Sequence, residues 1–243
     1  MTGSTMGRRV IAEGLGTFFL VLVGPGAVMV DAHTGGTITH VGVALAFAFV
    51  VIAMIYALGH LSGAHINPAV TVAFWSVGRF PSSQVLPYLL AQCAGAAVAS
   101  GLSRLALGTP GQMGATLPAV SLAAAFGAEW LMSFALMFVV MAVATDERVA
   151  AGFAPLAVGL TVGFCALVGG PLTGASMNPA RSFGPALVGG LWACTGCTGR
   201  PRSPGCSRPH DSTTCCDTPR RRASPPPVSH WASRDVFRSR SDS

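Results

Sequence analysis

The stretch Gly63-Ala64-His65-Ile66-Asn67-Pro68-Ala69 recurs in this chain as Gly174-Ala175-Ser176-Met177-Asn178-Pro179-Ala180. The two copies are 111 residues apart, so each belongs to an internal repeat that covers about half of the chain. Asparagine is a favoured helix N-cap, and proline fits the first helical position because its missing N–H is not needed there. Each copy therefore predicts the start of a helix.

The composition indicates that these helices lie in a membrane. Charged residues make up 10% of the chain and hydrophobic residues 51%, with a mean hydropathy of +0.57. A soluble domain has about 25% charged residues. Apolar segments long enough to cross a bilayer are expected at 10–30, 41–58, 86–107, 119–144 and 153–168, with a sixth near 187–192.

The segments that follow the two Asn-Pro-Ala triplets are too short to span. Residues 69–75 and 180–187 are apolar for only about two helical turns before Gly78 and Gly189, so we expect half-helices. The first repeat then has three full spans and one half-helix, whereas the second has two full spans, a half-helix and a truncated remainder in place of its last helix. Three crossings are an odd number, so the second copy enters the membrane from the opposite side. Inverted repeats bring the N-termini of such half-helices together near the midplane. Non-helical backbone is tolerated there only inside protein or beside a wet cavity, which predicts a pore.

These motifs carry a family resemblance. The doubled Gly-Ala-x-x-Asn-Pro-Ala, with Arg181 after the second copy, resembles the aquaporin, or major intrinsic protein, channels. The openings of the two repeats, at 13–19 and 128–130, resemble that family as well, and the likeness covers residues 8–193. The resemblance implies an all-α membrane protein with an aquaporin-like right-handed bundle. It also implies a homotetramer with one pore per subunit, passive transport of water or small neutral solutes, no cofactor and no nucleic-acid partner.

The resemblance implies a role for the two triplets, Asn67-Pro68-Ala69 and Asn178-Pro179-Ala180. Asn67 and Asn178 are expected to cap their half-helices and to point amide donors at the oxygen of a passing water molecule. The positive ends of the two half-helix dipoles meet at the same point, which raises the barrier to protons and cations.

The resemblance also implies a constriction formed by Phe47, Ala166, Ala175 and Arg181. Water-selective members typically carry histidine where this chain has Ala166, so a wider and less polar aperture is expected here. Glycerol-conducting members usually carry a second aromatic residue and an aspartate after the arginine, whereas this chain has Ala175 and Ser182. Water is the first prediction, and glycerol, ammonia and peroxide remain alternatives.

Three ionisable residues are predicted to support the pore loops. Glu13 and Glu129 occupy matching places in the two repeats, and glutamates at these places accept hydrogen bonds from the pore loops in the family. His65 precedes the first triplet. It either lines the inner vestibule or braces a loop carbonyl, and the sequence favours neither. We find no metal cluster, catalytic nucleophile or cofactor loop, so we do not expect an enzyme.

The sequence divides into a first repeat (1–107), a connecting loop (108–118) that resembles the water-channel pattern, an incomplete second repeat (119–193) and a tail (194–243). The tail holds nine of the fifteen arginines and five of the seven cysteines. The cysteine spacing fits no standard zinc finger. Binding of nucleic acid or anionic lipid by the arginines would leave the missing sixth helix unexplained.

A shifted reading frame explains both the tail and the missing helix. The codons of residues 193–200, read one base out of phase, permit Leu-His-Trp-Val-Tyr-Trp-Ala, which resembles the start of the sixth span in aquaporins. We therefore hypothesise that 194–243 is a disordered, out-of-frame tail. A chain without its sixth helix is expected to lack a closed pore, so a non-conducting product or a structural membrane protein is a further alternative.

Arginine placement predicts the orientation. Arg8, Arg9, Arg79 and Arg148 all fall on one side of the expected topology, and positive residues favour the cytoplasmic side. Arg104 is the exception. We expect a cytoplasmic N-terminus and a location in the plasma membrane.

Overall fold

The computed structural model describes residues 5–145, 149 and 152–192, and the regular elements in this part of the chain are all helical. In chain order these are α1 (Met6–His33), α2 (Thr39–Ser62), α3 (Pro68–Ser76), α4 (Ser82–Leu107), η1 (Pro110–Gly114), α5 (Leu122–Thr145), α6 (Ala154–Thr173) and α7 (Pro179–Gly189). The long helices α1, α2, α4, α5 and α6 are each long and apolar enough to cross a membrane. The five expected full spans and the two half-helices are therefore all found as helices.

The helix ends differ from the expected bounds. Helix α1 begins at Met6, four residues before the expected start, and α2 continues to Ser62. The sixth span expected near 187–192 is wrong for these residues, because Leu187 belongs to α7 and the two last described residues are not helical. Gly190 has a φ of 66° and donates its backbone N–H to the carbonyl of Ala186, which is a glycine-type helix end.

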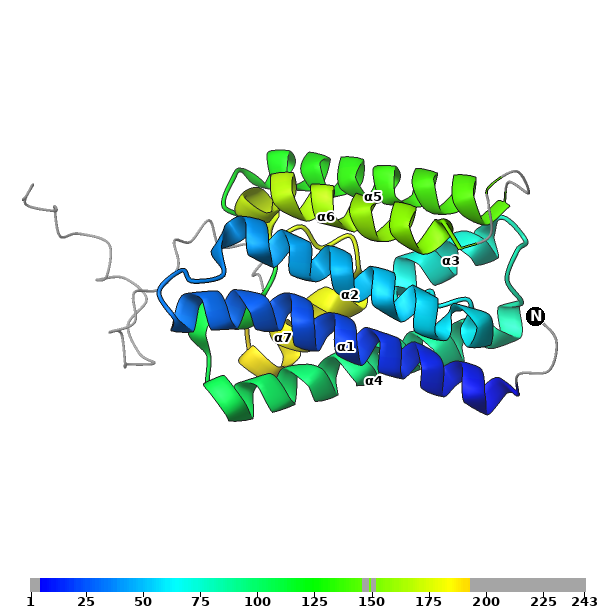
Figure 1. Cartoon of the computed structure of the whole chain (residues 1–243), viewed down its shortest axis with the longest axis horizontal. Coiled ribbons are helices and arrows are strands. Elements are labelled where there is room, and N and C mark those ends of the chain that lie inside the picture. Colours follow the sequence, from blue (N-terminus) through cyan, green and yellow to red (C-terminus); the bar gives the residue numbers. More distant parts are fainter. Residues whose placement is uncertain (1–4, 146–148, 150–151, 193–243) are drawn as a thin grey trace, which may run out of the picture. The chain divides into compact units, whose positions relative to one another are not determined.

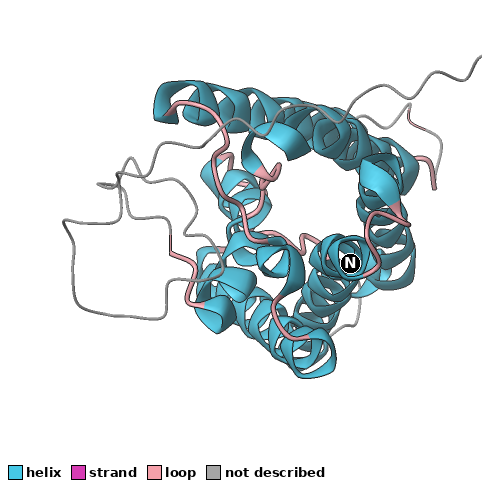
Figure 2. Cartoon of the chain, turned by 90° about the vertical axis from the view of Figure 1, so that its left-hand side faces the viewer, coloured by secondary structure: helices cyan, strands magenta, loops and turns pink. Residues whose placement is uncertain are grey.

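The half-helices pack against one side of the bundle of long helices, α3 against α4 and α7 against α4 and α1. Helix α1 packs against α2 and α4, α2 packs against α6, and α6 packs against α5, while α7 packs against α4. Viewed end-on, the helices form a ring (Figure 2). In Figure 1, α3 lies toward the right-hand end of the bundle and α7 toward the left-hand end. Their N-termini meet in the middle, as the inverted repeat predicts.

Two apolar clusters hold this arrangement together. One joins buried residues of α1, α2 and α4 and includes Leu20, Val51 and Ala96. The other joins α2, α5 and α6 and includes Phe47, Leu136 and Ala166. The loop before α3 contributes Ile66 to the first cluster, and the loop before α7 contributes Met177 to the second. The half-helices are thus anchored by apolar side chains as well as by the hydrogen bonds described below.

Candidate functional site

The two asparagines cap the half-helices. The Oδ1 atom of Asn67 accepts a hydrogen bond of 2.9 Å from the backbone N–H of Ala69. The Oδ1 atom of Asn178 accepts bonds of 3.0 Å from Ala180 and 3.3 Å from Arg181. Both asparagines have extended backbone and are followed by proline at the first helical position. The local sequence alone therefore accounts for both helix starts.

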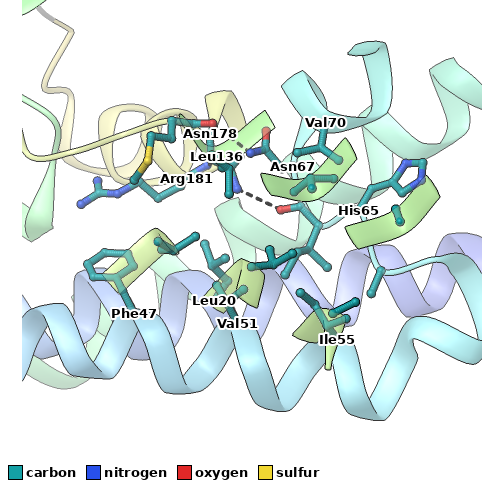
Figure 3. A pocket seen from close by; sticks show the side chains of 18 of the residues that line it. Leu20, Phe47, Val51, Ile55, His65, Asn67, Val70, Leu136, Asn178 and Arg181 are labelled. Carbon is teal, nitrogen blue, oxygen red and sulfur yellow. Dashed lines mark hydrogen bonds between the residues drawn. The ribbon is translucent and has the colours of Figure 1, made fainter. Parts of the chain in front are cut away.

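The amide nitrogens of the same two asparagines join the repeats. Asn67 donates from Nδ2 to the carbonyl of Met177 at 2.9 Å, and Asn178 donates from Nδ2 to the carbonyl of Ile66 at 2.9 Å. Each residue thus binds the loop of the other repeat, and the two half-helix N-termini are held face to face (Figure 3). A carboxamide has two N–H donors, so each asparagine keeps one donor beyond this exchange.

A cavity of about 150 Å³ runs past the asparagine pair. Phe47 and Arg181 lie at one end of it and His65 toward the other, with Asn67 and Asn178 between them (Figure 3). Most of the remaining lining is aliphatic, from α1, α2, α5 and α6. The lining thus combines an apolar wall with a few polar groups at fixed places.

A second cavity, of about 420 Å³, adjoins the first. Phe47, Ala166 and Arg181 line both cavities, so these side chains form the junction between them. Ala175 lines the first cavity only. The structure therefore brings together all four residues of the expected constriction, with three of them at the junction.

Arg181 is held in place by backbone carbonyls. Its side chain is 2% exposed. Nη1 donates to the carbonyl of Gly114 at 2.7 Å, and Nη2 donates to the carbonyl of Gly174 at 3.2 Å. The guanidinium carbon lies 5.1 Å from the centroid of the Phe47 ring, within the range of a cation–π contact. Its buried Nε has no hydrogen-bond partner among the described residues. A guanidinium has five N–H donors, so Arg181 keeps donors beyond the two bonds to these carbonyls.

Glu13 fixes the first pore loop. Its Oε1 accepts hydrogen bonds from the Ser62 hydroxyl at 2.7 Å and from the backbone N–H of His65 at 2.9 Å. Its Oε2 accepts bonds from the backbone N–H of Ile66 at 2.7 Å and from Nε2 of Gln92 at 2.8 Å. This carboxylate is fully buried. It therefore satisfies loop N–H groups that have no partner in a helix.

Glu129 makes the equivalent contacts in the second repeat. Its Oε1 accepts hydrogen bonds from the Thr173 hydroxyl at 2.6 Å and from the backbone N–H of Ser176 at 2.9 Å. Its Oε2 accepts one bond of 3.0 Å from the backbone N–H of Met177. The three donors stand at the same places in their loop as the three loop donors to Glu13 in the other repeat.

His65 combines a lining position with an aromatic contact. Its ring stacks on Phe74, with centroids 5.0 Å apart, and also contacts Phe80 and Tyr88. Nδ1 is 3.1 Å from the hydroxyl of Thr71. Of the two alternatives from the sequence, the ring lines the cavity. The hydrogen bond of its ring nitrogen goes to a hydroxyl rather than to a loop carbonyl.

Sequence reasoning missed several residues that complete the site. Gln92 comes from α4 to reach Glu13, Gly114 of η1 receives Arg181, and Thr116 donates to the hydroxyl of Ser182 at 2.8 Å. Gln92 is the only one of these with a sequence signal, since a glutamine inside an apolar span needs a partner. Among the described residues, no three His, Cys, Asp or Glu side chains cluster closely enough to hold a metal ion. The cysteines of the tail lie outside the described residues.

Comparisons with known proteins agree with this geometry. Residues 1–195 match the family model described as "Major intrinsic protein". Aquaporin NIP1-3 of Oryza sativa subsp. japonica is 49% identical over 186 residues, which are 76% of this chain and 65% of that protein. Nodulin-26 of Glycine max is 45% identical over 184 residues, which are 75% of this chain and 68% of that protein. The match thus spans about two thirds of the length of these plant relatives.

A solved structure also resembles the fold. The X-ray structure of the aquaglyceroporin from Plasmodium falciparum aligns with a TM-score of 0.65 and 28% sequence identity. The alignment covers 76% of this chain and 81% of that one.

Proposed function

Because the chain belongs to the major intrinsic protein family, whose aquaporins are channels and not enzymes, we propose that it is a passive transmembrane channel for water. One observation carries the proposal: two cavities share the lining residues Phe47, Ala166 and Arg181, and the paired asparagines line one of these cavities. The two cavities together have hydrogen-bond donors at the asparagine pair and at the residues that they share. A water molecule needs such groups where the rest of the wall is apolar.

The same geometry supports exclusion of protons. The remaining N–H of Asn67 and that of Asn178 would both donate to the oxygen of one water molecule. This orientation of the water molecule prevents it from passing a proton along the file of water molecules in the pore. The half-helix N-termini add positive potential at this point. Arg181 adds a full positive charge at the junction, which opposes entry of cations. Under this proposal the pore passes neutral molecules only.

Small neutral solutes are a second candidate. Ala166 and Ala175 leave the wall beside Arg181 with two methyl groups, which favours an aperture wider than a single water molecule. The similarity to an aquaglyceroporin favours the same candidate. Glycerol, ammonia and peroxide are the neutral solutes of suitable size.

Stopped-flow light scattering on proteoliposomes tests both candidates. Osmotic water flow and glycerol uptake are measured for the full chain and for a form in which the reading frame is restored after residue 193. Water flow in the restored form above that of empty liposomes is expected. Flow equal to empty liposomes for water and for every solute tested would overturn the channel proposal. Resequencing the gene tests the frame shift itself: an unbroken frame with no apolar helix in the alternative phase would remove it.

The placement and assembly of the channel belong to the same proposal. The chain is an integral membrane protein. We assign it to the plasma membrane, with the N-terminus in the cytoplasm and four copies in a homotetramer. If the chain as given conducts nothing while the restored form conducts, the non-conducting product is the correct description of this chain.

A further inference from the structure

Three hydroxyl groups form a hydrogen-bonded chain beside Arg181. Ser182, the next residue of α7, accepts a hydrogen bond of 2.8 Å from the hydroxyl of Thr116. The hydroxyl of Ser182 also bonds to that of Ser176. Ser176 in turn donates to the backbone carbonyl of Asn178 at 3.1 Å. A hydroxyl has only one proton, so Ser182 is the donor to Ser176, and the chain runs in one direction toward the pore asparagine.

This hydroxyl chain joins the same segments as the guanidinium of Arg181. Arg181 donates to the carbonyl of Gly114 in the connecting loop and to that of Gly174 in the second pore loop, which precedes α7. Each hydroxyl partner of Ser182 stands two residues after one of these glycines. The two segments also touch, since a Cβ atom added to Gly174 would lie 3.0 Å from Cα of Thr116. Two neighbouring residues of α7 therefore hold the same two segments.

The connecting loop needs such a tie because its backbone is strained. Gln112 and Met113 have φ angles of 50° and 56°, in the left-handed region that residues other than glycine rarely adopt. Strained backbone persists only where the surrounding structure holds it. The carbonyl that receives Arg181 belongs to Gly114, directly after this strained pair. The bond from Thr116 to α7 fixes the loop on the other side of that carbonyl.

Ser182 does not itself form a cavity wall. Arg181 lines both cavities of the site, whereas Ser182 lines neither. Any influence of the Ser182 hydroxyl on a molecule in these cavities therefore passes through the residues that it holds.

We propose that Ser182 is a positioning residue for Arg181. Through Thr116 it holds the carbonyl of Gly114 in place, and through Ser176 it holds the second pore loop. The guanidinium stays fixed because the hydroxyl chain fixes the two carbonyls to which it donates. Under the proposed channel function, a fixed guanidinium means an aperture of constant width. This consequence rests on that function, whereas the place of Arg181 does not.

The reactivity of Arg181 with 2,3-butanedione, a small arginine-selective reagent, tests the proposal on the full chain in detergent. Mass spectrometry of the peptide that contains residue 181 gives the rate of modification, and exposed Arg79 is the internal reference. Ser182→Ala is expected to raise the rate at Arg181 about fivefold, because one net hydrogen bond shifts an opening equilibrium by about that factor. The rate at Arg79 is expected to stay the same.

Three further variants separate positioning from a general loss of stability. Ser182→Thr keeps the hydroxyl and is expected to keep the slow rate. Ser100→Ala is the matched control, since it removes a buried hydroxyl that contacts α7 but has no hydrogen-bond partner among the described residues. It is expected to leave the rate unchanged. Thr116→Val is expected to raise the rate, but to add nothing to Ser182→Ala, because that variant has already lost the link.

A cysteine pair provides a second measurement that restores the link instead of removing it. In a background with the native cysteines replaced by serine, Thr116→Cys and Ser182→Cys are combined, since the two hydroxyl oxygens lie 2.8 Å apart. Oxidation is expected to join the two cysteines, and reduction to separate them. Arg181 is expected to react more slowly in the oxidised sample than in the reduced one.

Several results would overturn the proposal. These are an unchanged rate in Ser182→Ala, a fast rate in Ser182→Thr, a cysteine pair that does not cross-link, and equal rates in its oxidised and reduced forms. None of these measurements depends on conduction. A frame-restored form that conducts nothing would contradict the proposed channel function and leave the rates at Arg181 as they are, so the two failures are distinguishable.

Discussion

Ala166 and Arg181 set the character of the junction between the two cavities. Arg181 is fixed by the carbonyls of Gly114 and Gly174 and by the Phe47 ring, so its position cannot adapt to a solute. Ala166 offers only a methyl group at the same place. Under the proposed function, we therefore expect the size of the residue at 166 to decide which neutral molecules fit beside the guanidinium.

Replacement of Ala166 by histidine is expected to reduce glycerol permeability about tenfold relative to water permeability, because the imidazole fills the aperture that a polyol needs. Both permeabilities are measured by stopped-flow light scattering in the frame-restored form. Ala166→Val is the matched control, since it adds volume without a hydrogen-bond donor. A histidine variant that lowers both permeabilities equally would show that position 166 does not select by size.

Glu13 of α1 accepts four hydrogen bonds, three of them from Ser62, His65 and Ile66 at the first pore loop. Replacement by glutamine turns one of the two acceptor oxygens into an NH₂ donor. In one orientation of the amide this donor faces the donors of Ser62 and His65, and in the other it faces those of Ile66 and Gln92. A buried donor left without an acceptor costs about 1–3 kcal/mol. Glu13→Gln is therefore expected to lower the midpoint of thermal unfolding in detergent by several degrees.

The control for Glu13→Gln is Asp31→Asn at the end of α1. Asp31 accepts the backbone N–H of Thr39 through Oδ1 alone, and asparagine keeps that acceptor. The unfolding midpoint of the Asp31→Asn variant is expected to match that of the unchanged chain. An unchanged midpoint in Glu13→Gln as well would mean that the carboxylate does not hold the loop.

At the scale of elements, the sequence predicts which segments are helical better than where the helices end. The five spans follow from apolar length, and both half-helices follow from asparagine and proline at their starts. The sequence does not predict in the same way which elements contact one another. The bond from Gln92 to Glu13 joins residues 79 positions apart, and that from Asn67 to Met177 joins residues 110 positions apart. No local pattern encodes such pairs.

The crossing of α1 and α4 gives a matched pair of glycine substitutions. Gly95→Ala places a methyl group against the backbone of Gly14 and is expected to destabilise the protein, because backbone cannot move aside as a side chain can. Gly101→Ala, on the same helix with open space around it, is expected to be neutral or stabilising by up to about 1 kcal/mol. Thermal unfolding in detergent compares the two. Equal midpoints would contradict a close crossing at Gly95.

At the scale of the whole molecule, the topology separates the connecting segments into two groups. Thr37, between α1 and α2, and Ser83, at the start of α4, lie at opposite ends of the bundle because one full span and one half-helix separate them. Arg8, Arg9 and Arg79 lie at the end that includes Ser83. Their charge favours the cytoplasmic side for that end.

Labelling of intact cells with a membrane-impermeant maleimide tests this orientation. In a background with the native cysteines replaced by serine, Thr37→Cys is expected to react from outside. Ser83→Cys is expected to react only after the cells are permeabilised. The reverse pattern would place the N-terminus outside. Reaction of both cysteines in intact cells would contradict the prediction that positions 37 and 83 lie on opposite sides of the membrane.

The sequence by itself determined the elements: a duplicated Asn-Pro-Ala motif caps two helices locally, and apolar length fixes the spans because a bilayer demands about 20 such residues. Only the tertiary structure decided how these elements form a site. It placed Ala166 of α6 and Phe47 of α2 beside Arg181, and it exchanged hydrogen bonds between the two loops. It also left Glu129 one donor short of Glu13. The reason is physical: capping and hydrophobic length act over a few neighbouring residues, whereas a cavity exists only where distant helices meet.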